Sequence, residues 1–367
     1  MRQSQLNIRH RELGSKLDGD TWNDMPVPWS YHTDPQDEIL AVRTRAGLYD
    51  FSGLNLVDVK GSDAEATIDK LVAIDVTKLK PGTARLAAEV DDNGGICDDI
   101  MVIRYGKDDF RLSHGSGATQ RNLKTLAAGK NVSWEQNHDA HVLCFTGPRA
   151  AKILAPHVAF DLSKLKYFQH IDTQLFGKDV KMSRSGYSGE DGFEIYSNSK
   201  DIIYLWDTIL AVGTRDEVMP CSWTCLDIGR LEAYLLFYPF DMPEGDTTPW
   251  EVNMGWTVDL DKRGDYTGKK ALLAARGKER YKQAGICCKA DHAMEAGAKI
   301  YKDGKEIGIV TSAMFSRYLM QSLAMVHLQP DCTGLGTLLE VRGKGGNYTG
   351  IVSRTPFYDP QRLRTRV

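Results

Sequence analysis

The stretch Arg184-Ser-Gly-Tyr-Ser-Gly-Glu-Asp-Gly-Phe-Glu-Ile-Tyr196 decides the fold. Its three glycines predict a flexible loop, and the alternating residues after the loop predict a strand over 193–196. Neighbouring side chains of a strand point to opposite faces, so Glu194 should point away from Phe193 and Ile195. Glu194 is then either a solvated acid or part of a polar pocket, where its two oxygens accept paired hydrogen bonds from a planar heterocycle. The glycine spacing does not match a phosphate-binding loop.

Two adjacent acids, Asp98 and Asp99, follow the dipeptide Asn93-Gly94. Asn-Gly favours a hairpin turn, and the apolar run after it favours a strand. The two acids must therefore point to opposite faces, and only one of them can line a given site. The alternative is that both are solvated acids at a strand edge.

The segment Cys225–Phe237 predicts an amphipathic helix that carries Arg230 and Glu232 among apolar residues. Charged groups in such a setting need ionic partners or a binding site. An internal salt bridge that fixes the helix explains the pair equally well.

Upstream, apolar residues at helical spacing over 38–50 end at Gly47, and strands then alternate with helices to about residue 275. From Ala284 onward, short apolar runs separated by glycine turns predict a small β-barrel. The polar stretch 276–284 is the expected boundary. We therefore predict two domains, residues 1–280 and 281–367.

The composition is that of a folded protein and favours a small-molecule substrate. The chain has 367 residues and a net charge of -3, with no concentration of Lys and Arg for nucleic acid or an anionic membrane. No signal peptide or membrane span is apparent, which predicts a cytoplasmic protein. Seven cysteines without paired C-x-x-C spacing predict reduced thiols and no metal site.

Taken together, these elements resemble the glycine-cleavage T-protein family, the folate-binding aminomethyltransferases and their demethylase relatives. The resemblance runs almost end to end. It implies an α+β fold of three lobes around a channel for tetrahydrofolate, with two α/β lobes in residues 1–280 and the small β-barrel at the C-terminus. The motifs that carry it are Leu40–Asp50, Asn93–Asp99, Arg184–Tyr196, Arg230–Ala233, Met254–Leu260 and Thr355–Tyr358.

The resemblance also implies roles for individual residues. Asp99 is the expected catalytic acid beside the reacting folate nitrogen, and it is preferred to Asp98 because relatives with one acid in this turn keep the second. A carboxylate there can orient the amine, take up its proton and stabilise positive charge. The implied folate-binding residues are Glu194 on the pterin ring, Tyr187 against the cofactor, and Arg230, Tyr167, Met101 and Tyr196 along the channel.

Several stretches depart from the glycine-cleavage enzyme, at 52–55, 113–117 and 238–254. Because the folate-side residues persist, the chain is predicted to be a demethylase that moves a methyl group from a small N-, S- or O-methylated donor to folate N5. An onium donor would suit aromatic walls, and the candidate donor-pocket residues are His114, Trp250 and Tyr238.

Two other functions remain open. One is the glycine-cleavage aminomethyltransferase, with a lipoyl carrier protein as partner. The other is a non-catalytic folate-binding regulatory protein.

Overall fold

The computed structural model describes residues 2–243 and 245–364 of the chain. They form two compact units, and the chain passes through each unit more than once. The first unit contains the residues up to Leu54, Asn137–Leu235 and the residues from Gln361 onward, and the second contains Asn55–Gln136 and Leu236–Pro360.

A six-stranded sheet with the order β10-β11-β12-β9-β3-β13 forms the centre of the first unit. Its neighbouring strands are antiparallel, except that β13 runs parallel to β3. The predicted strand over 193–196 lies within β12. The strands are β3 (Gly47–Asp50), β9 (Ala140–Thr146), β10 (His170–Leu175), β11 (Lys178–Ser183), β12 (Gly192–Asn198) and β13 (Met219–Pro220).

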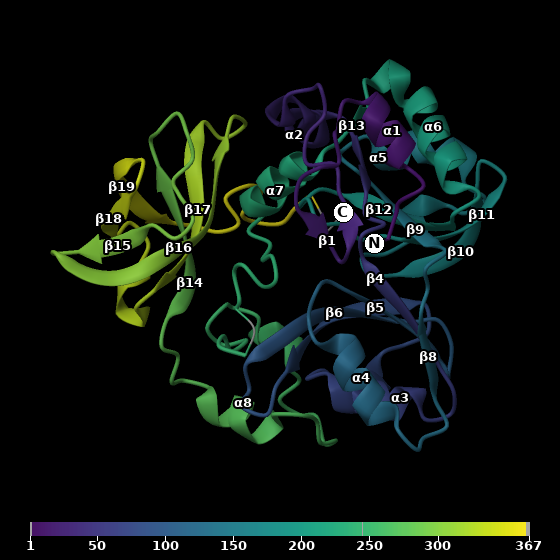
Figure 1. The fold of residues 1–367 in the computed structure, drawn as a ribbon, viewed down its shortest axis with the longest axis horizontal. Helices are drawn as coiled ribbons and strands as arrows, with labels where there is room; N and C mark the ends of the chain where they lie inside the picture. Colours follow the sequence, from purple (N-terminus) through teal and green to yellow (C-terminus); the bar gives the residue numbers. More distant parts are fainter. Residues whose placement is uncertain (1, 244, 365–367) are drawn as a thin grey trace. The chain divides into compact units, whose positions relative to one another are not determined.

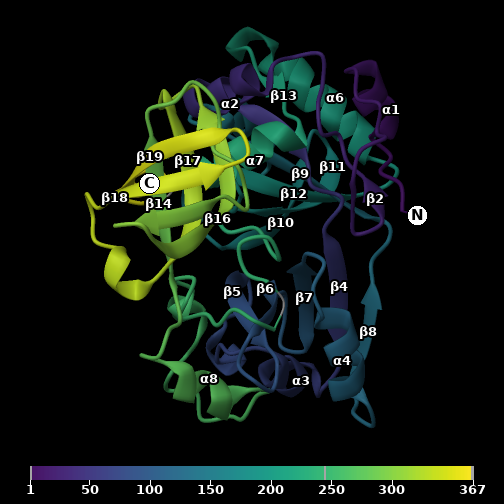
Figure 2. The same cartoon turned by 60° about the vertical axis from the view of Figure 1, so that its left-hand side comes forward.

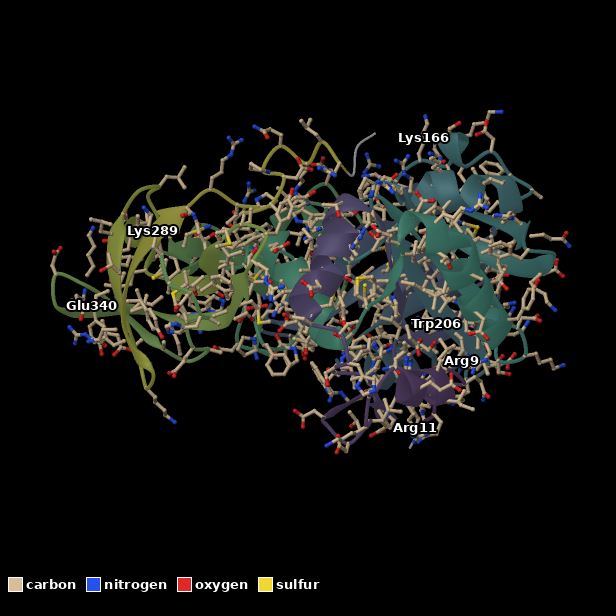
Figure 3. The ribbon with its side chains drawn as sticks, turned by 90° about the horizontal axis from the view of Figure 1, so that it is seen from above. Arg9, Arg11, Lys166, Trp206, Lys289 and Glu340 are labelled. Carbon is tan, nitrogen blue, oxygen red and sulfur yellow. The ribbon has the colours of Figure 1, made fainter. Side chains whose placement is uncertain are left out.

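Helices cover one face of this sheet. Phe193 and Ile195 of β12 are buried there together with Trp206 of α6. Arg9 of α1 binds Asp207, the neighbour of Trp206, at 2.7 Å. Figure 3 labels Arg9 and Trp206 close to each other. The remaining elements of the unit are α1 (Asn7–Glu12), β1 (Thr21–Trp22), β2 (Met25–Pro26), α2 (Pro35–Thr44), α5 (Ala150–Leu154), α6 (Ile202–Val212) and α7 (Trp223–Glu232).

The second unit contains a five-stranded antiparallel sheet with the order β5-β6-β7-β4-β8. Figures 1 and 2 show α3 and α4 side by side on one face of it. Val57 of β4, Ile100 of β6 and Leu112 of β7 point to that face and are buried in one core. The elements are β4 (Asn55–Lys60), α3 (Ala64–Leu71), β5 (Thr83–Val90), β6 (Ile96–Arg104), β7 (Asp109–His114), α4 (Thr119–Ala127) and β8 (Ser133–Gln136).

A closed six-stranded barrel with the order β14-β17-β16-β15-β18-β19 lies in the same unit, so the predicted C-terminal barrel is confirmed (Figure 2). The last residues of the expected linker over 276–284 belong to β14 rather than to a loop. The predicted domain boundary at residue 280 stays a prediction. The elements are α8 (Lys269–Ala275), β14 (Lys282–Cys288), β15 (Lys299–Lys302), β16 (Lys305–Ser316), β17 (Gln321–Leu328), β18 (Leu338–Gly343) and β19 (Gly346–Ser353).

The helix predicted over Cys225–Phe237 ends earlier than expected, since the observed helix α7 stops at Glu232. Tyr234 has a left-handed φ of 57°, which breaks the helical path. The backbone N–H groups of Tyr234 and Leu235 donate to the carbonyls of Leu231 and Arg230, a closure that satisfies the last turn. In the described part of the chain, no helix is long and apolar enough to cross a membrane.

Candidate functional site

Asp98 and Asp99 point to opposite faces of β6, as the alternation along a strand requires. Asp98 pairs with Glu89 of β5 and is fully buried on the face covered by α3 and α4, whereas Asp99 pairs with Ala88 and is partly exposed on the other face. Met101, two residues further, shares the face of Asp99. Asp99 is therefore the acid of this pair that a substrate can reach.

Asp99 has an unusual proton affinity. Burial, followed by the negative charge of Asp98, raises the pKa of Asp99 to about 7. The backbone N–H of Asp99 also donates to Asp98 Oδ1 at 2.9 Å, which fixes the two acids relative to each other. A carboxyl group with a pKa near neutrality can both accept and return a proton during a reaction.

His114, at the end of β7, lies on the helix-covered face with Asp98. Its Cα pairs with that of Ile100, and its Nδ1 lies 2.9 Å from Asp98 Oδ2. The side chain is 2% exposed. The structure thus places this candidate donor residue on the face opposite to Asp99.

In the first unit, Glu194 lies on the face of the sheet opposite to Phe193 and Ile195, as expected from the strand alternation. The hydroxyl of Tyr196 donates to Glu194 Oε2 at 2.6 Å. Burial raises the pKa of Glu194, while hydrogen bonds from Tyr196 and Ser185 act in the opposite direction. Glu194 and Tyr196 are thus brought together as a polar pair on a partly exposed sheet face.

Two more predicted folate-side tyrosines lie near Glu194. Burial and then the charge of Glu194 raise the pKa of Tyr167, whose side chain is 47% exposed. The loop after β11 brings the backbone N–H of Tyr187 to the thiol of Cys144, the residue that pairs with Glu194 across β9 and β12. The hydroxyl of Tyr196, the phenol of Tyr167 and the backbone of Tyr187 therefore lie in the neighbourhood of Glu194.

A buried arginine that the sequence interpretation missed holds this loop in place. Arg43 of α2 donates to Glu232 Oε2 at 2.8 Å and to the carbonyl of Ser188 at 2.7 Å, and it lies 3.4 Å from Glu190 Oε1. It also donates to the carbonyl of Gly229 at 3.1 Å. The available signal was helical spacing, since Arg43 lies four residues after Ile39 on the apolar side of the helix.

Arg230 and Glu232 do not pair with each other. Arg230 donates to Asp227 at 2.7 Å and to the carbonyl of Leu235 at 3.3 Å, and it is 3% exposed. Glu232 is bound by Arg43 instead. The salt bridge within α7 is therefore Arg230–Asp227, and Arg230 remains a predicted folate-side residue.

The comparisons with known proteins identify the family. Residues 7–262 match the GCVT N-terminal domain, and residues 282–359 match the glycine cleavage T-protein C-terminal barrel domain. The chain belongs to the glycine-cleavage T-protein family. The family and fold class predicted from the sequence are thereby confirmed.

Relatives of this T-protein family member include more than one activity. It is 37% identical to a heme-dependent oxidative N-demethylase gamma subunit of Ectopseudomonas mendocina, over 98% of this chain and 97% of that protein. It is 31% identical to an aminomethyltransferase of Thermotoga maritima, over 98% of both. A crystal structure of glycine cleavage system aminomethyltransferase T from Bartonella henselae matches with a TM-score of 0.89 and 27% identity, over 98% of both chains.

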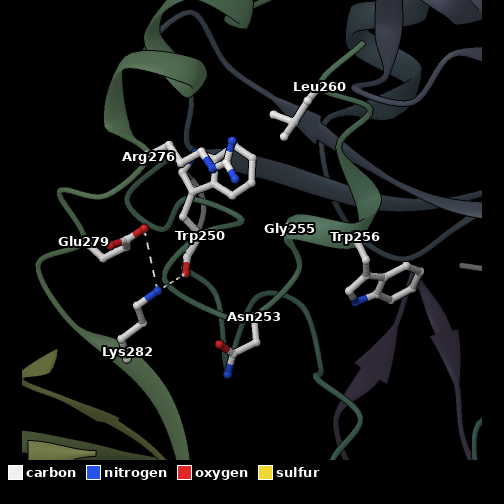
Figure 4. Close-up of a pocket in the computed structure, with 8 residues that line it drawn as sticks. All are labelled: Trp250, Asn253, Gly255, Trp256, Leu260, Arg276, Glu279 and Lys282. Atoms are coloured by element: carbon white, nitrogen blue, oxygen red, sulfur yellow. Dashed lines mark hydrogen bonds and ion pairs between the residues drawn. The ribbon is translucent and has the colours of Figure 1, made fainter. Parts of the chain in front are cut away.

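The second unit of the T-protein family member also has a pocket of about 420 Å³, shown in Figure 4. Trp250 lines it, but its indole N–H donates to the carbonyl of Leu272 at 2.7 Å and its ring belongs to a buried core. The guanidinium of Arg276 lies 5.7 Å from the ring centroid, so a cation already lies over this ring. The pocket is lined by Trp250, Asn253, Gly255, Trp256, Leu260, Arg276, Glu279 and Lys282.

Tyr238, the remaining donor candidate, is buried in a different core with Ile96 and Met254. Lys282 and Glu279 of the pocket already pair with each other at 3.6 Å. The candidate functional residues are therefore Asp99 in the second unit and Glu194 in the first, rather than the lining of this pocket. Among the residues that the structure describes, no group of three or more His, Cys, Asp or Glu side chains could hold a metal ion.

The residues around Glu194 fit the pterin of tetrahydrofolate. A carboxylate has about four acceptor positions on its two oxygens, and Tyr196 and Ser185 use two of them. The remaining positions suit adjacent N–H groups of a planar ring, and the exposed ring of Tyr167 offers an apolar face.

Proposed function

We propose that this chain is a tetrahydrofolate-dependent one-carbon transferase, most simply a demethylase that moves a methyl group from a small methylated donor to folate N5. The observation that carries the proposal is the placement of Asp99 and Glu194. Each acid lies partly exposed on its sheet, and each has a raised pKa. The resemblance to the T-protein family, which implies a folate role for both positions, supports the proposal.

The chemistry uses both acids in different ways. The lone pair of N5 forms a bond to the methyl carbon, and the bond between that carbon and the donor atom breaks, with its electron pair going to the donor. N5 then carries a positive charge until its proton leaves. Asp99, as a carboxylate, stabilises that charge and takes up the proton, while Glu194 orients the pterin ring.

A second candidate function comes from the oxidative N-demethylase gamma subunit that this chain resembles. An oxidative demethylation releases carbon at the oxidation level of formaldehyde. A folate-binding subunit could capture that carbon as methylenetetrahydrofolate, with loss of water, instead of accepting a methyl group. In this case the protein would act together with a redox partner subunit.

The mass of the folate product separates these candidates. Purified protein is incubated with tetrahydrofolate and a panel of methylated amines, sulfonium compounds and methoxy-aromatics, and separately with formaldehyde or with the aminomethylated lipoyl carrier protein. Methyltetrahydrofolate from the panel supports the demethylase. If methylenetetrahydrofolate forms from formaldehyde faster with the protein than without it, the protein captures formaldehyde. If methylenetetrahydrofolate forms only with the carrier protein, the chain is an aminomethyltransferase. Folate binding without any turnover supports a regulatory protein.

The role of Asp99 has its own test. We expect Asp99→Asn to reduce turnover by about 10²- to 10⁴-fold, because the charge and the proton acceptor are lost. Folate affinity should change little, since the amide has almost the same shape. Single-turnover kinetics and titration with tetrahydrofolate measure the two effects. Unchanged turnover would remove Asp99 from the mechanism.

A further inference from the structure

Behind Asp99, on the helix-covered face of the sheet, two buried carboxyl groups contact one hydroxyl. Thr119 Oγ1 of α4 lies 2.6 Å from Asp98 Oδ2 and 2.9 Å from Glu89 Oε2. Glu89 is 1% exposed, and Asp98 and Thr119 are fully buried. Three elements, β5, β6 and α4, therefore bring two acids together away from solvent.

The number of protons in this arrangement is constrained. A threonine hydroxyl has one proton, so it can donate to only one of two acceptors at a time. If both carboxyl groups were ionised, one of the two contacts would place oxygen lone pairs against each other. Two carboxylates that share a buried site also repel each other, which favours a proton on one of them.

The neighbouring groups indicate which acid is ionised. Asp98 Oδ1 accepts from the backbone N–H of Asp99, and Asp98 Oδ2 accepts from Thr119 and lies 2.9 Å from His114 Nδ1. Glu89 Oε1 has the amide of Asn122 at 2.5 Å. Burial and then the charge of Asp98 raise the pKa of Glu89 to about 7. The proton therefore belongs on Glu89.

We propose that Glu89 and Asp98 share one proton through Thr119, with the proton on Glu89, and that the charge retained on Asp98 makes it a positioning residue for Asp99. Glu89 then donates to Thr119, and Thr119 donates to Asp98. The negative charge of Asp98, one residue away along the backbone, increases the proton affinity of Asp99. The effect on turnover rests on the proposed transferase function, whereas the shared proton does not.

Other titratable groups face this chain of hydrogen bonds from each adjacent element. β7 contributes His114, whose Nδ1 lies 2.9 Å from Asp98 Oδ2. In the described part of the chain, neither ring nitrogen of His114 makes a hydrogen bond of good geometry. β6 contributes Cys97, whose thiol lies near the amide of Asn122. The two cations of α4, Arg121 and Lys124, are exposed to solvent. Gly117 packs directly against the carboxyl group of Asp98, because a Cβ added at Gly117 would lie 2.3 Å from Asp98 Cγ. This close packing restricts the position of the Asp98 side chain.

The pH dependence of turnover tests the proposal with a pair of isosteric variants. Asp98→Asn removes the charge behind Asp99, so the acid-side midpoint of the turnover profile should move down by about one pH unit. Glu89→Gln reproduces the protonated form and should leave that midpoint in place. Glu340→Gln, which removes an exposed carboxylate from the barrel, controls for the loss of one charge. Equal shifts for Glu89→Gln and Asp98→Asn would overturn the proposal.

The bridging hydroxyl gives a second variant pair. Thr119→Val keeps the shape but removes the hydrogen bond that stabilises the charge on Asp98. Its midpoint should move toward that of Asp98→Asn, and Thr119→Ser, which keeps the hydroxyl, should restore the wild-type value. A midpoint that is the same in Thr119→Val and wild type would contradict the shared proton.

Stability provides a readout that does not depend on catalysis. If Glu89 is protonated in the folded protein at pH 5, its contribution to the free energy of unfolding falls between pH 5 and pH 8, because the unfolded chain releases this proton more easily than the folded protein does. A glutamine at this position does not titrate, so it makes no such pH-dependent contribution. The urea midpoint of Glu89→Gln relative to wild type should therefore rise between pH 5 and pH 8. A constant difference would show an ionised Glu89 and refute the proposal. If the urea data support the shared proton while no protein turns over any donor, the proposed function alone fails.

Discussion

At the residue scale, Asp99 couples stability to pH. Its folded-state pKa of about 7 lies above the ordinary value of 3.8, so the folded protein binds more protons than the unfolded chain between these values. Stability contributed by this group therefore falls as pH rises through that window. We expect Asp99→Asn to raise the free energy of unfolding at pH 8 by about 1–3 kcal/mol.

Urea unfolding at pH 5 and pH 8 measures the effect. The gain from Asp99→Asn should be smaller at pH 5, where most of the folded protein already carries the proton. A loss of stability at pH 8 would show that Asp99 is not destabilised by its surroundings. The same variant should lose turnover, which would make Asp99 a position where stability and activity oppose each other.

A second residue-scale prediction concerns the loop before β12. Gly189 has a φ of +77°, and a Cβ there would lie 2.5 Å from Ala233 Cβ, whereas Gly177 has a φ of +74° and nothing within 4 Å. Both alanine variants should cost about 1 kcal/mol for the left-handed backbone. Gly189→Ala should cost at least about 1 kcal/mol more from overpacking, as measured by urea unfolding. Equal costs would mean that the loop and Ala233 can separate freely.

At the element scale, Arg43 joins α2 to α7 and to the loop that carries Tyr187. Both Arg43 and Glu232 are buried, so Arg43→Met leaves a carboxylate without its cation. We expect a loss of about 3–5 kcal/mol in the free energy of unfolding. Arg9→Met is the matched control, because Arg9 binds Asp207 at a similar distance on the exposed surface of α1 and α6.

Arg43→Met should also weaken folate binding more than its loss of stability explains, because Arg43 holds the carbonyl of Ser188 in the loop next to Tyr187. Titration with tetrahydrofolate at a temperature where the variant remains folded measures this. If Arg43→Met and Arg9→Met cost the same stability, the buried ion pair is not the link between these elements.

The elements show what sequence periodicity can and cannot predict. Strand alternation was sufficient to separate Asp99 from Asp98 and Glu194 from Phe193, because one buried face fixes the register of each strand. The end of α7 was missed because Tyr234, a residue with no special preference for positive φ, adopts the left-handed conformation that closes the helix. Tertiary contacts, not local propensity, determine that turn.

At the scale of the whole molecule, the contacts of buried charges could not be predicted. Glu232 was expected to pair within its own helix or to line a site, but its partner, Arg43, lies 189 residues away in the sequence. His114 was expected to line a donor pocket, which stays a prediction, but its position beside Asp98, set by the pairing of β6 with β7, was not foreseen. Such pairings depend on which strands become neighbours, and no local pattern records them.

The two candidate acids lie in different units of the chain, Glu194 in the first and Asp99 in the second. If Glu194 binds the pterin and Asp99 acts on N5, their variants should separate binding from turnover. We expect Glu194→Gln to weaken tetrahydrofolate affinity by about 10- to 100-fold, because the amide replaces one acceptor oxygen with a donor.

Calorimetric titration with tetrahydrofolate measures this affinity, and Asp172→Asn, an exposed acid on β10 of the same sheet, is the control. At saturating folate, Glu194→Gln should recover most of its turnover, whereas Asp99→Asn should not, since binding energy lost uniformly raises KM without lowering kcat. The opposite pattern, with kcat lost in Glu194→Gln and affinity lost in Asp99→Asn, would exchange the roles of the two acids and place the reacting nitrogen beside β12.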